Sequence, residues 1–303
     1  PAIVSSLTTI PGLVVEDGQQ TTSGTITFQD VDLIDTHVVG QTLKGGSASV
    51  ALPGFNPAVG APDAFVRAVS ERFTGEGLLV DQLFAYGAGC GTHERAARMK
   101  EALLLVWPKA RVEVYSDLLG AAHGLLGDRS GLVLILGTGM NAGWFDGAQL
   151  LLPMPSLGYI LGDEGSGADI GKHLLHAALH GQVPNDLMER IFPDGLSTTE
   201  VVERIYRGDS PQAWLASFTG KLAPVIDHPW ARAFVLSRFR VLAELLTVHF
   251  NEGQRADVVA TGSVAHGMSD LLRSALGERG MRLSDVQPSP LPGLLRYRAA
   301  FVR

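Results

Sequence analysis

The chain of 303 residues is long enough for one large domain or two mid-sized domains, and 46% of its residues are hydrophobic. Its net charge of −7 and its 24 scattered Lys and Arg residues argue against a nucleic-acid partner, which requires clustered cations. No apolar run approaches the ~18 residues of a membrane span, no secretory signal is visible, and the single cysteine excludes an internal disulfide framework, so we expect a cytoplasmic protein.

The first half of the chain alternates predicted strands and helices. A strand over 13–17 and the alternating apolar positions of 25–39 suggest three antiparallel strands, although the third could instead be 48–52. The elements predicted next are a helix over 61–73, a strand over 82–89 that enters a glycine turn, a helix from a Thr92 cap to about 106, a strand over 111–116 and a helix over 118–126.

The alternation then starts again. A strand over 132–136 leads into a hairpin, and a long helix is predicted from about Ser166. The later predicted elements are a helical insertion over 183–225, a helix over 230–251, a strand over 256–263 and a helix over 265–276. This order predicts two α/β lobes, 1–127 and 128–303, with a cleft between them. A functional site is expected at the carboxyl ends of the strands, where glycine turns accumulate.

Three of the glycine turns, over 16–24, 137–141 and 261–267, are candidate phosphate cradles. A turn with positive φ needs glycine and points successive backbone N–H groups at one spot, which attracts an anion. An ordinary turn accounts for any one of these stretches. Three of them at matching strand ends in two lobes favour phosphate binding.

Three carboxylates accompany these turns. Asp17 closes the first predicted strand, where it either forms the turn or holds Mg²⁺. Asp117 follows the strand over 111–116 and is either a helix cap or a general base that takes a proton from an attacking hydroxyl. Asp163 stands between glycines where a helix begins, and either caps that helix or hydrogen-bonds a polyhydroxylated ligand.

Five motifs, "DGQQTT", "SDLLGAA", "ILGTGMN", "PSLGYILGDEGSGADIGK" and "TGSVA", occur in the order seen in the sugar-kinase branch of the actin/hexokinase/heat-shock-70 superfamily. From Asp17 to about Tyr297 the chain resembles the N-acetylglucosamine kinase group of the BadF/BadG/BcrA/BcrD ATPase family. The segment from Tyr115 to Lys172 is highly specific, and the N-terminal motif is much less so. The resemblance implies two ribonuclease-H-like lobes, the actin-like ATPase fold, closing over ATP, Mg²⁺ and a sugar.

The resemblance also implies roles for single residues. Asp117 would be the base that activates the 6-hydroxyl of an amino sugar such as N-acetylglucosamine, and Asp17 would hold Mg²⁺. Residues implied to bind the ATP phosphates are Gly18, Thr21, Thr22, Gly137, Thr138 and Gly139, and those implied to lie against the adenosine are Gly262 and Ser263. Residues implied to contact the sugar are Asn56 in "PGFNP", Asn141, Gly158 and Asp163. Relatives are often dimers, so a homodimer is expected by analogy.

The chain departs from the family pattern in its first turn. Gln19 replaces a glycine and Thr22 replaces a cation, and the loss of a charge beside the triphosphate would weaken transition-state stabilisation. This leaves open a second hypothesis, a catalytically weakened sugar or nucleotide sensor of the same fold. A third, the ATPase activator of a radical dehydratase, needs paired cysteines, whereas the chain has only Cys90, which is expected to be a small buried residue.

Overall fold

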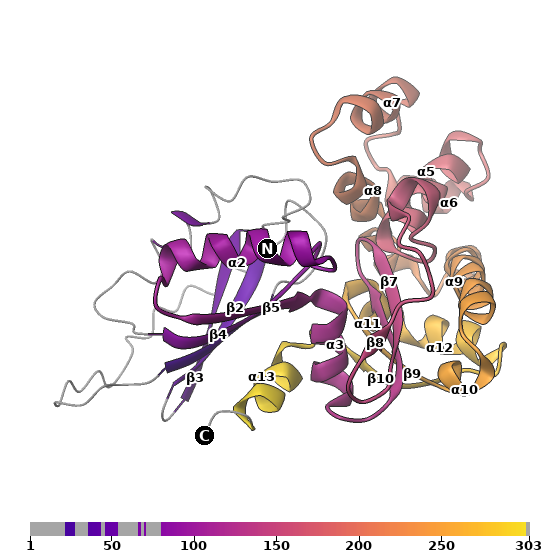
Figure 1. Cartoon of the computed structure of the whole chain (residues 1–303). Coiled ribbons are helices and arrows are strands. Elements are labelled where there is room, and N and C mark those ends of the chain that lie inside the picture. The colour runs from indigo at the N-terminus through magenta and orange to yellow at the C-terminus, as the bar shows by residue number, and fades with distance from the viewer. Residues whose placement is uncertain are drawn as a thin grey trace.

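The computed structural model of the chain describes residues 22–27, 36–43, 46–53, 66–67, 70 and 80–300. It contains two five-stranded sheets, which lie side by side in Figure 1 with two helices, α3 (Asp117–Leu126) and α13 (Leu291–Ala299), between them. Within the described ranges, none of the helices combines the length and apolarity that crossing a membrane requires. The two sheets and their flanking helices confirm the predicted α/β class.

The first sheet has the strand order β3-β2-β1-β4-β5. Its strands are β1 (Thr22–Thr27), β2 (Thr36–Leu43), β3 (Gly46–Pro53), β4 (Val80–Gly87) and β5 (Arg111–Ser116). The first three strands are antiparallel, which is the predicted kind of pairing, and the third corresponds to the alternative over 48–52. Strands β1 and β2 overlap the two ends of the stretch predicted over 25–39, while the predicted strand over 13–17 lies outside the described residues. Because β1, β4 and β5 are parallel, their carboxyl ends share one edge. Helix α2 (His93–Val106) covers one face, and Thr92 Oγ1 caps it as predicted by accepting from Arg95 N at 3.4 Å.

The second sheet has the order β10-β9-β6-β7-β8. Its strands are β6 (Gly131–Leu136), β7 (Met140–Phe145), β8 (Leu150–Leu151), β9 (Asp257–Thr261) and β10 (Arg282–Gln287). Strands β6 and β7 form the predicted hairpin, and β9 pairs in parallel with β6. Strands β8 and β10 were not predicted. The central strand β6 is buried on both faces, which explains its continuous apolar run.

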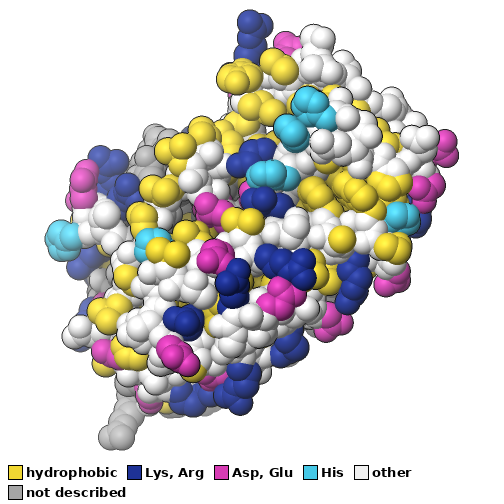
Figure 2. All heavy atoms as spheres, turned by 90° about the vertical axis from the view of Figure 1, so that its right-hand side faces the viewer, with side chains coloured by type: hydrophobic (Ala, Val, Ile, Leu, Met, Phe, Trp, Pro, Cys, Tyr) yellow, Lys and Arg dark blue, Asp and Glu magenta, His cyan; other side chains and the backbone are white. Residues whose placement is uncertain are grey.

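Helices account for most of the rest of the second half. They are α4 (Gly158–Leu161), α5 (Gly167–Leu179), the insertion α6 (Asn185–Ile191), α7 (Thr198–Arg207) and α8 (Pro211–Gly220) followed by a 3-10 turn (Ala223–Val225), then α9 (Pro229–His249), α10 (Glu252–Arg255), α11 (Ser263–Gly267) and α12 (Ser269–Gly277). The insertion, predicted as helical, extends to one end of the molecule, and α9 and α12 line the outer side of the second sheet (Figure 1). On the face seen in Figure 2, Lys and Arg side chains alternate with Asp and Glu, so this face presents no single-sign patch.

Helices α3 and α13 cross with their backbones in direct contact. A Cβ added at Gly293 would lie 1.8 Å from the carbonyl oxygen of Gly124, so only glycine permits this approach. The other side of α3 packs against Val133 and Phe145 of the second sheet, while Leu294 of α13 packs against Tyr86 of the first. The two helices therefore connect the sheets through one crossing.

A buried aromatic cluster surrounds a cation at this crossing. The Arg298 guanidinium lies 4.2 Å from the centroid of the Phe84 ring and donates to the Tyr86 hydroxyl. That hydroxyl is also 3.0 Å from His123 Nδ1, and the His123 ring stacks on Tyr297. Burial, together with the positive charge of Arg298, lowers the pKa of His123 to about 4, so this histidine is neutral at physiological pH.

Candidate functional site

Two of the three predicted glycine turns lie against each other at the carboxyl edge of the second sheet. Strands β6 and β9 are parallel neighbours, with Ile135 opposite Thr261, so the turns that follow them are adjacent. A Cβ added at Gly262, which has a φ of 112°, would lie 2.5 Å from the carbonyl oxygen of Leu136 and 3.1 Å from Gly137 N. Within the described residues, the buried Thr261 hydroxyl at this junction has no hydrogen-bond partner.

The turn over 137–139 is oriented by the start of α5. Its carbonyl oxygens at Gly137 and Thr138 accept from Gly167 N and Ala168 N, at 2.7 and 2.9 Å. In a trans peptide the N–H points opposite to the C=O of the preceding residue. The N–H groups of Thr138 and Gly139 therefore both point away from α5. Such a pair of amides has the arrangement that an anion requires.

Asp163 stands immediately beside this turn. Its Oδ2 accepts from Gln212 Nε2 at 3.4 Å, and a Cβ added at Gly139 would lie 3.1 Å from that nitrogen and 3.2 Å from Oδ2. Because Gly139 has no side chain, the side chains of Asp163 and Gln212 can pack against it. The helix-cap interpretation of Asp163 is wrong, because Ser166 Oγ caps α5 by accepting from Asp169 N at 3.2 Å. Asp163 instead adopts a φ of 59°, in the left-handed region, and is 6% exposed.

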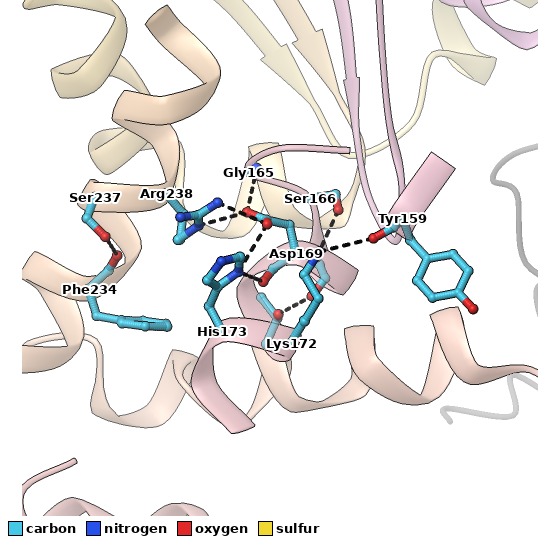
Figure 3. A network of polar contacts seen from close by, with 11 residues as sticks. Tyr159, Gly165, Ser166, Asp169, Lys172, His173, Phe234, Ser237 and Arg238 are labelled. Atoms are coloured by element: carbon cyan, nitrogen blue, oxygen red, sulfur yellow. Dashed lines mark hydrogen bonds and ion pairs between the residues drawn. The ribbon is translucent and has the colours of Figure 1, made fainter. Parts of the chain in front are cut away.

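A buried ion pair fixes the loop that carries Asp163 (Figure 3). Asp169 receives two hydrogen bonds from Arg238 of α9, at 2.9 and 3.0 Å, and one from the backbone N–H of Gly165 at 3.0 Å. Burial on its own would raise the pKa of Asp169, but hydrogen bonds from His173 and Arg238 hold it below its usual range. The carboxylate therefore stays charged and anchors the loop backbone two residues after Asp163.

Two residues expected to contact the sugar share a hollow of about 370 Å³, a volume that includes space open to solvent. Asn141 and Asp163 both line it. The other lining residues are Met140, Met154, Pro155, Ser156, Leu157, Gly162, Glu164, Leu245 and His249. Gly158, the third residue expected to contact the sugar, follows Leu157 and begins helix α4 with a φ of 68°. Lys172 Nζ holds this helix by donating to the Tyr159 carbonyl oxygen at 3.1 Å.

Asp117 lies at the start of α3, on the side of the second sheet that also carries Asn141. The neighbouring Leu118 lies 3.1 Å from a Cβ added at Gly143, and residues 141 and 143 of a strand share one face. At its other end, α3 places Leu126 against Gly131, the start of β6, so its first turn is directed toward the carboxyl edge. The cap of α3 is Ser116, whose Oγ accepts from Leu119 N at 3.2 Å, while Asp117 Oδ1 accepts from Leu118 N at 2.8 Å.

The turn after β4 lies beside Asp117. Gly87 and Ser116 are paired at the ends of β4 and β5, and Cys90 N donates to the Gly87 carbonyl at 3.2 Å. Cys90 is 4% exposed, which confirms the prediction of a small buried residue. Burial, and then the nearby negative charge of Asp117, raise the pKa of its thiol to about 12. The thiol is therefore protonated and is a neutral neighbour of the carboxylate.

The first predicted turn does not join this arrangement in the described residues. Residues 22–24 were predicted to belong to a turn, but they form the start of β1, where β-branched threonines suit a strand. Thr22 pairs with Val80 at the amino end of β4, whereas Asp117 follows the opposite edge, about 16 Å away at ~3.3 Å per residue. The prediction of Thr22 in a phosphate turn is therefore wrong. Asp17, Gly18, Thr21 and Asn56 lie outside the described residues.

Two residues of the site were missed by the sequence interpretation, namely Gln212 and Arg238. They lie 49 and 69 positions from their carboxylate partners, so no local pattern connects them. Gln212 precedes an aromatic pair in the core: Phe218 is 8% exposed, Trp214 is partly buried, and the two rings pack edge to face at 4.9 Å. The feature of the sequence that could have pointed to Gln212 is its position two residues before Trp214.

Neither a protein-family model nor a curated protein matches the chain, so its placement in the BadF/BadG/BcrA/BcrD family stays a prediction. Among solved structures, a candidate N-acetylglucosamine kinase from Porphyromonas gingivalis is 32% identical, with a TM-score of 0.81, over 92% of this chain and 99% of that one.

Two more distant structures share the fold. A candidate N-acetylglucosamine kinase from Chromobacterium violaceum is 16% identical, with a TM-score of 0.62, over 91% of this chain and 98% of that one. The ROK family glucokinase of Streptomyces griseus, solved with glucose and AMPPNP, is 14% identical, with a TM-score of 0.52, over 92% of this chain and 98% of that one. Because the Porphyromonas gingivalis protein matches at 32% identity over nearly the full length of both chains, this chain belongs to the same family, one of sugar kinases built on the actin-like ATPase fold.

Proposed function

We propose that the chain transfers the γ-phosphoryl group of ATP to the 6-hydroxyl of an amino sugar, N-acetylglucosamine. The observation that carries this proposal is the junction at which the turns over 137–139 and 262–263 meet, with Asp163 beside them. Asn141 and Asp163 line one hollow, and Asp117 lies on the same side of the sheet as Asn141. These placements support a site in which backbone amides hold the nucleotide phosphates, Asn141 and Asp163 contact the sugar, and Asp117 acts as the base.

In an in-line transfer of the phosphoryl group, each of these site residues would have a separate role. Asp117 would accept the proton of the 6-hydroxyl, a role that contributes roughly 10²–10⁴-fold in rate. The N–H groups of Thr138 and Gly139 would hold phosphate oxygens, and Gly262 and Ser263 would lie against the adenosine. ATP supplies the phosphoryl group, so the remaining task of the protein is positioning and charge stabilisation. Mg²⁺ is assigned to Asp17, which stays a prediction, as does the homodimer.

The lining of the hollow supports an N-acetylated sugar over a plain hexose. Met140, Met154 and Leu157 offer apolar surface, which suits an acetamido methyl group. Asn141 and Asp163 offer hydrogen-bond donors and acceptors, which suit hydroxyl and amide groups. We therefore expect the site to bind a sugar with the acetamide more tightly than one without it, because apolar surface would otherwise face water.

An ADP-release assay tests the proposal. We expect turnover with N-acetylglucosamine to exceed turnover with glucosamine or glucose, and Asp117→Asn to lower kcat by 10²-fold or more while calorimetry still detects sugar binding. Asp146→Asn is the matched control, because Asp146 lies in the turn after β7, at the end of that strand remote from Asn141. If Asp117→Asn turns over as fast as wild type, Asp117 is not the base.

The sensor hypothesis is distinguished by the same pair of measurements. It now rests on Gln19, which replaces a glycine of the family pattern, because Thr22 lies in strand β1. It requires sugar binding by calorimetry without ADP release. The 32% identity to a candidate N-acetylglucosamine kinase favours catalysis, and a kcat of about 1 s⁻¹ or more would remove the sensor hypothesis.

A further inference from the structure

The insertion reaches the candidate site through a tight crossing of α5 and α8. A Cβ added at Gly171 would lie 1.8 Å from the carbonyl oxygen of Leu215, and one added at Gly167 would lie 3.1 Å from the Cβ of Ala216. Thr219 Oγ1 stabilises the contact between α5 and α8 by donating to the Gly167 carbonyl oxygen at 2.7 Å. Two glycines one helical turn apart thus let α8 dock directly on the backbone of α5.

This docking determines where the start of α8 lies. Its second residue, Gln212, places Nε2 3.4 Å from Asp163 Oδ2 and 3.1 Å from the position that a Cβ of Gly139 would occupy. The carboxamide therefore lies beside both the turn over 137–139 and the carboxylate of Asp163. It is the point at which the helical insertion contacts both parts of the site.

We propose that Gln212 is a positioning residue for sugar binding. The backbone of Asp163 is already fixed, by its left-handed φ of 59° and by the tether from Gly165 N to Asp169. The hydrogen bond from Gln212 adds a constraint on the rotation of the carboxylate about its side-chain bonds. A carboxylate held at one oxygen presents the other in a set direction, and a sugar hydroxyl requires that direction. This inference rests on the proposed function.

Two substitutions of Gln212 distinguish the proposed positioning role from a merely structural one. Gln212→Met keeps the length and volume of the side chain but removes the donor. Gln212→Glu keeps the shape and places a second negative charge beside Asp163, which repels it. A packing role predicts that Gln212→Met behaves like wild type, because only charge repulsion, which is absent from Met, would then weaken binding. A donor role predicts a graded loss, with Glu worse than Met.

The test measures the calorimetric Kd of the full chain for N-acetylglucosamine, the KM for sugar and for ATP, and the melting temperature. We expect Gln212→Met to raise the Kd and KM for the sugar about tenfold, and Gln212→Glu about a hundredfold, as loss of a charge-assisted hydrogen bond implies. The KM for ATP and the melting temperature should stay at the wild-type values. Gln182→Met and Gln182→Glu are matched controls, because Gln182 is exposed in the loop after α5.

The outcomes distinguish failure of the positioning role from failure of the proposed function. If Gln212→Met binds the sugar within twofold of wild type, or if the KM for ATP and the melting temperature change in step with the sugar KM, the positioning role is refuted while the kinase proposal stands. If wild type neither binds nor phosphorylates any amino sugar, the proposed function fails first and this inference falls with it.

Discussion

Gly171→Ala is expected to weaken both the fold and the site, although alanine is the better helix former. The new methyl group would lie 1.8 Å from the carbonyl oxygen of Leu215, and ordinary contact begins at 3.4 Å, so α8 must withdraw by about 1.6 Å. Helix propensity favours alanine by ~1 kcal/mol. Overpacking costs roughly 1–3 kcal/mol, and it is at the upper end here because the atom that must yield is backbone.

The net loss should be about 2 kcal/mol, which corresponds to a melting temperature lowered by roughly 4–8 °C. The withdrawal also stretches the 3.4 Å contact between Gln212 and Asp163 beyond hydrogen-bond range. Thermal unfolding and the KM for N-acetylglucosamine measure the two effects. Gly220→Ala, in the same α8, is the control, since a Cβ there meets no atom within 4 Å and should be neutral or slightly stabilising.

Two outcomes would refute this reasoning. If Gly171→Ala melts at or above the temperature of Gly220→Ala, the α5–α8 contact is not as close as described. If the melting temperature falls but the sugar KM does not rise, α8 stabilises the fold without positioning Asp163.

The other predictions concern buried polar groups and the helix crossing. The pKa of His123 is lowered from 6.5 to about 4, so its contribution to stability is fully present above pH 6.5 and is lost as the pH falls toward 4. The expected loss in the free energy of unfolding is on the order of 3 kcal/mol. Urea unfolding at several pH values should show this loss in wild type and a smaller one in His123→Phe. Arg238→Met leaves the Asp169 carboxylate buried and should cost about 3–5 kcal/mol in the free energy of unfolding, and adding Asp169→Asn should recover part of it; a loss under 1 kcal/mol would contradict a buried pair. Gly293→Ala places a methyl group 1.8 Å from the Gly124 carbonyl oxygen and should lower the melting temperature by several degrees, whereas an unchanged melting temperature would show that the crossing is looser.

Elements with one strong local signal could be predicted from the sequence. The apolar run of β6, the Thr92 cap of α2 and the Ser166 cap of α5 each identify their element without help from distant residues. Strand β10 has the alternation of "RLSDVQ" but little apolar character, and α13 begins with Leu-Pro-Gly, which is typical of a turn. Both elements are stabilised mainly by partners far away in the chain, so a local pattern could not reveal them.

The candidate site divides in the same way. Asn141 and Asp163 could be placed together because the family resemblance implies that both contact the sugar, and the structure puts them in one hollow. The pairing of Gln212 with Asp163 depends on the α5–α8 crossing, and that of Arg238 with Asp169 on the packing of α9, neither of which has a signature in any short segment. The early position of Thr22 was misjudged because a run of hydroxyl residues suits a turn and a strand equally well.

The return of α13 to the first sheet has a consequence for how the chain folds during its synthesis. Leu294 and Arg298 complete the aromatic cluster formed by Phe84 and Tyr86, more than two hundred positions earlier. A ribosome that has released the strands of the first lobe has therefore not yet made the residues that cover them. The second lobe, whose sheet lies within residues 131–287, can finish first, although it is translated later. The lobe that emerges earliest is the last to be completed.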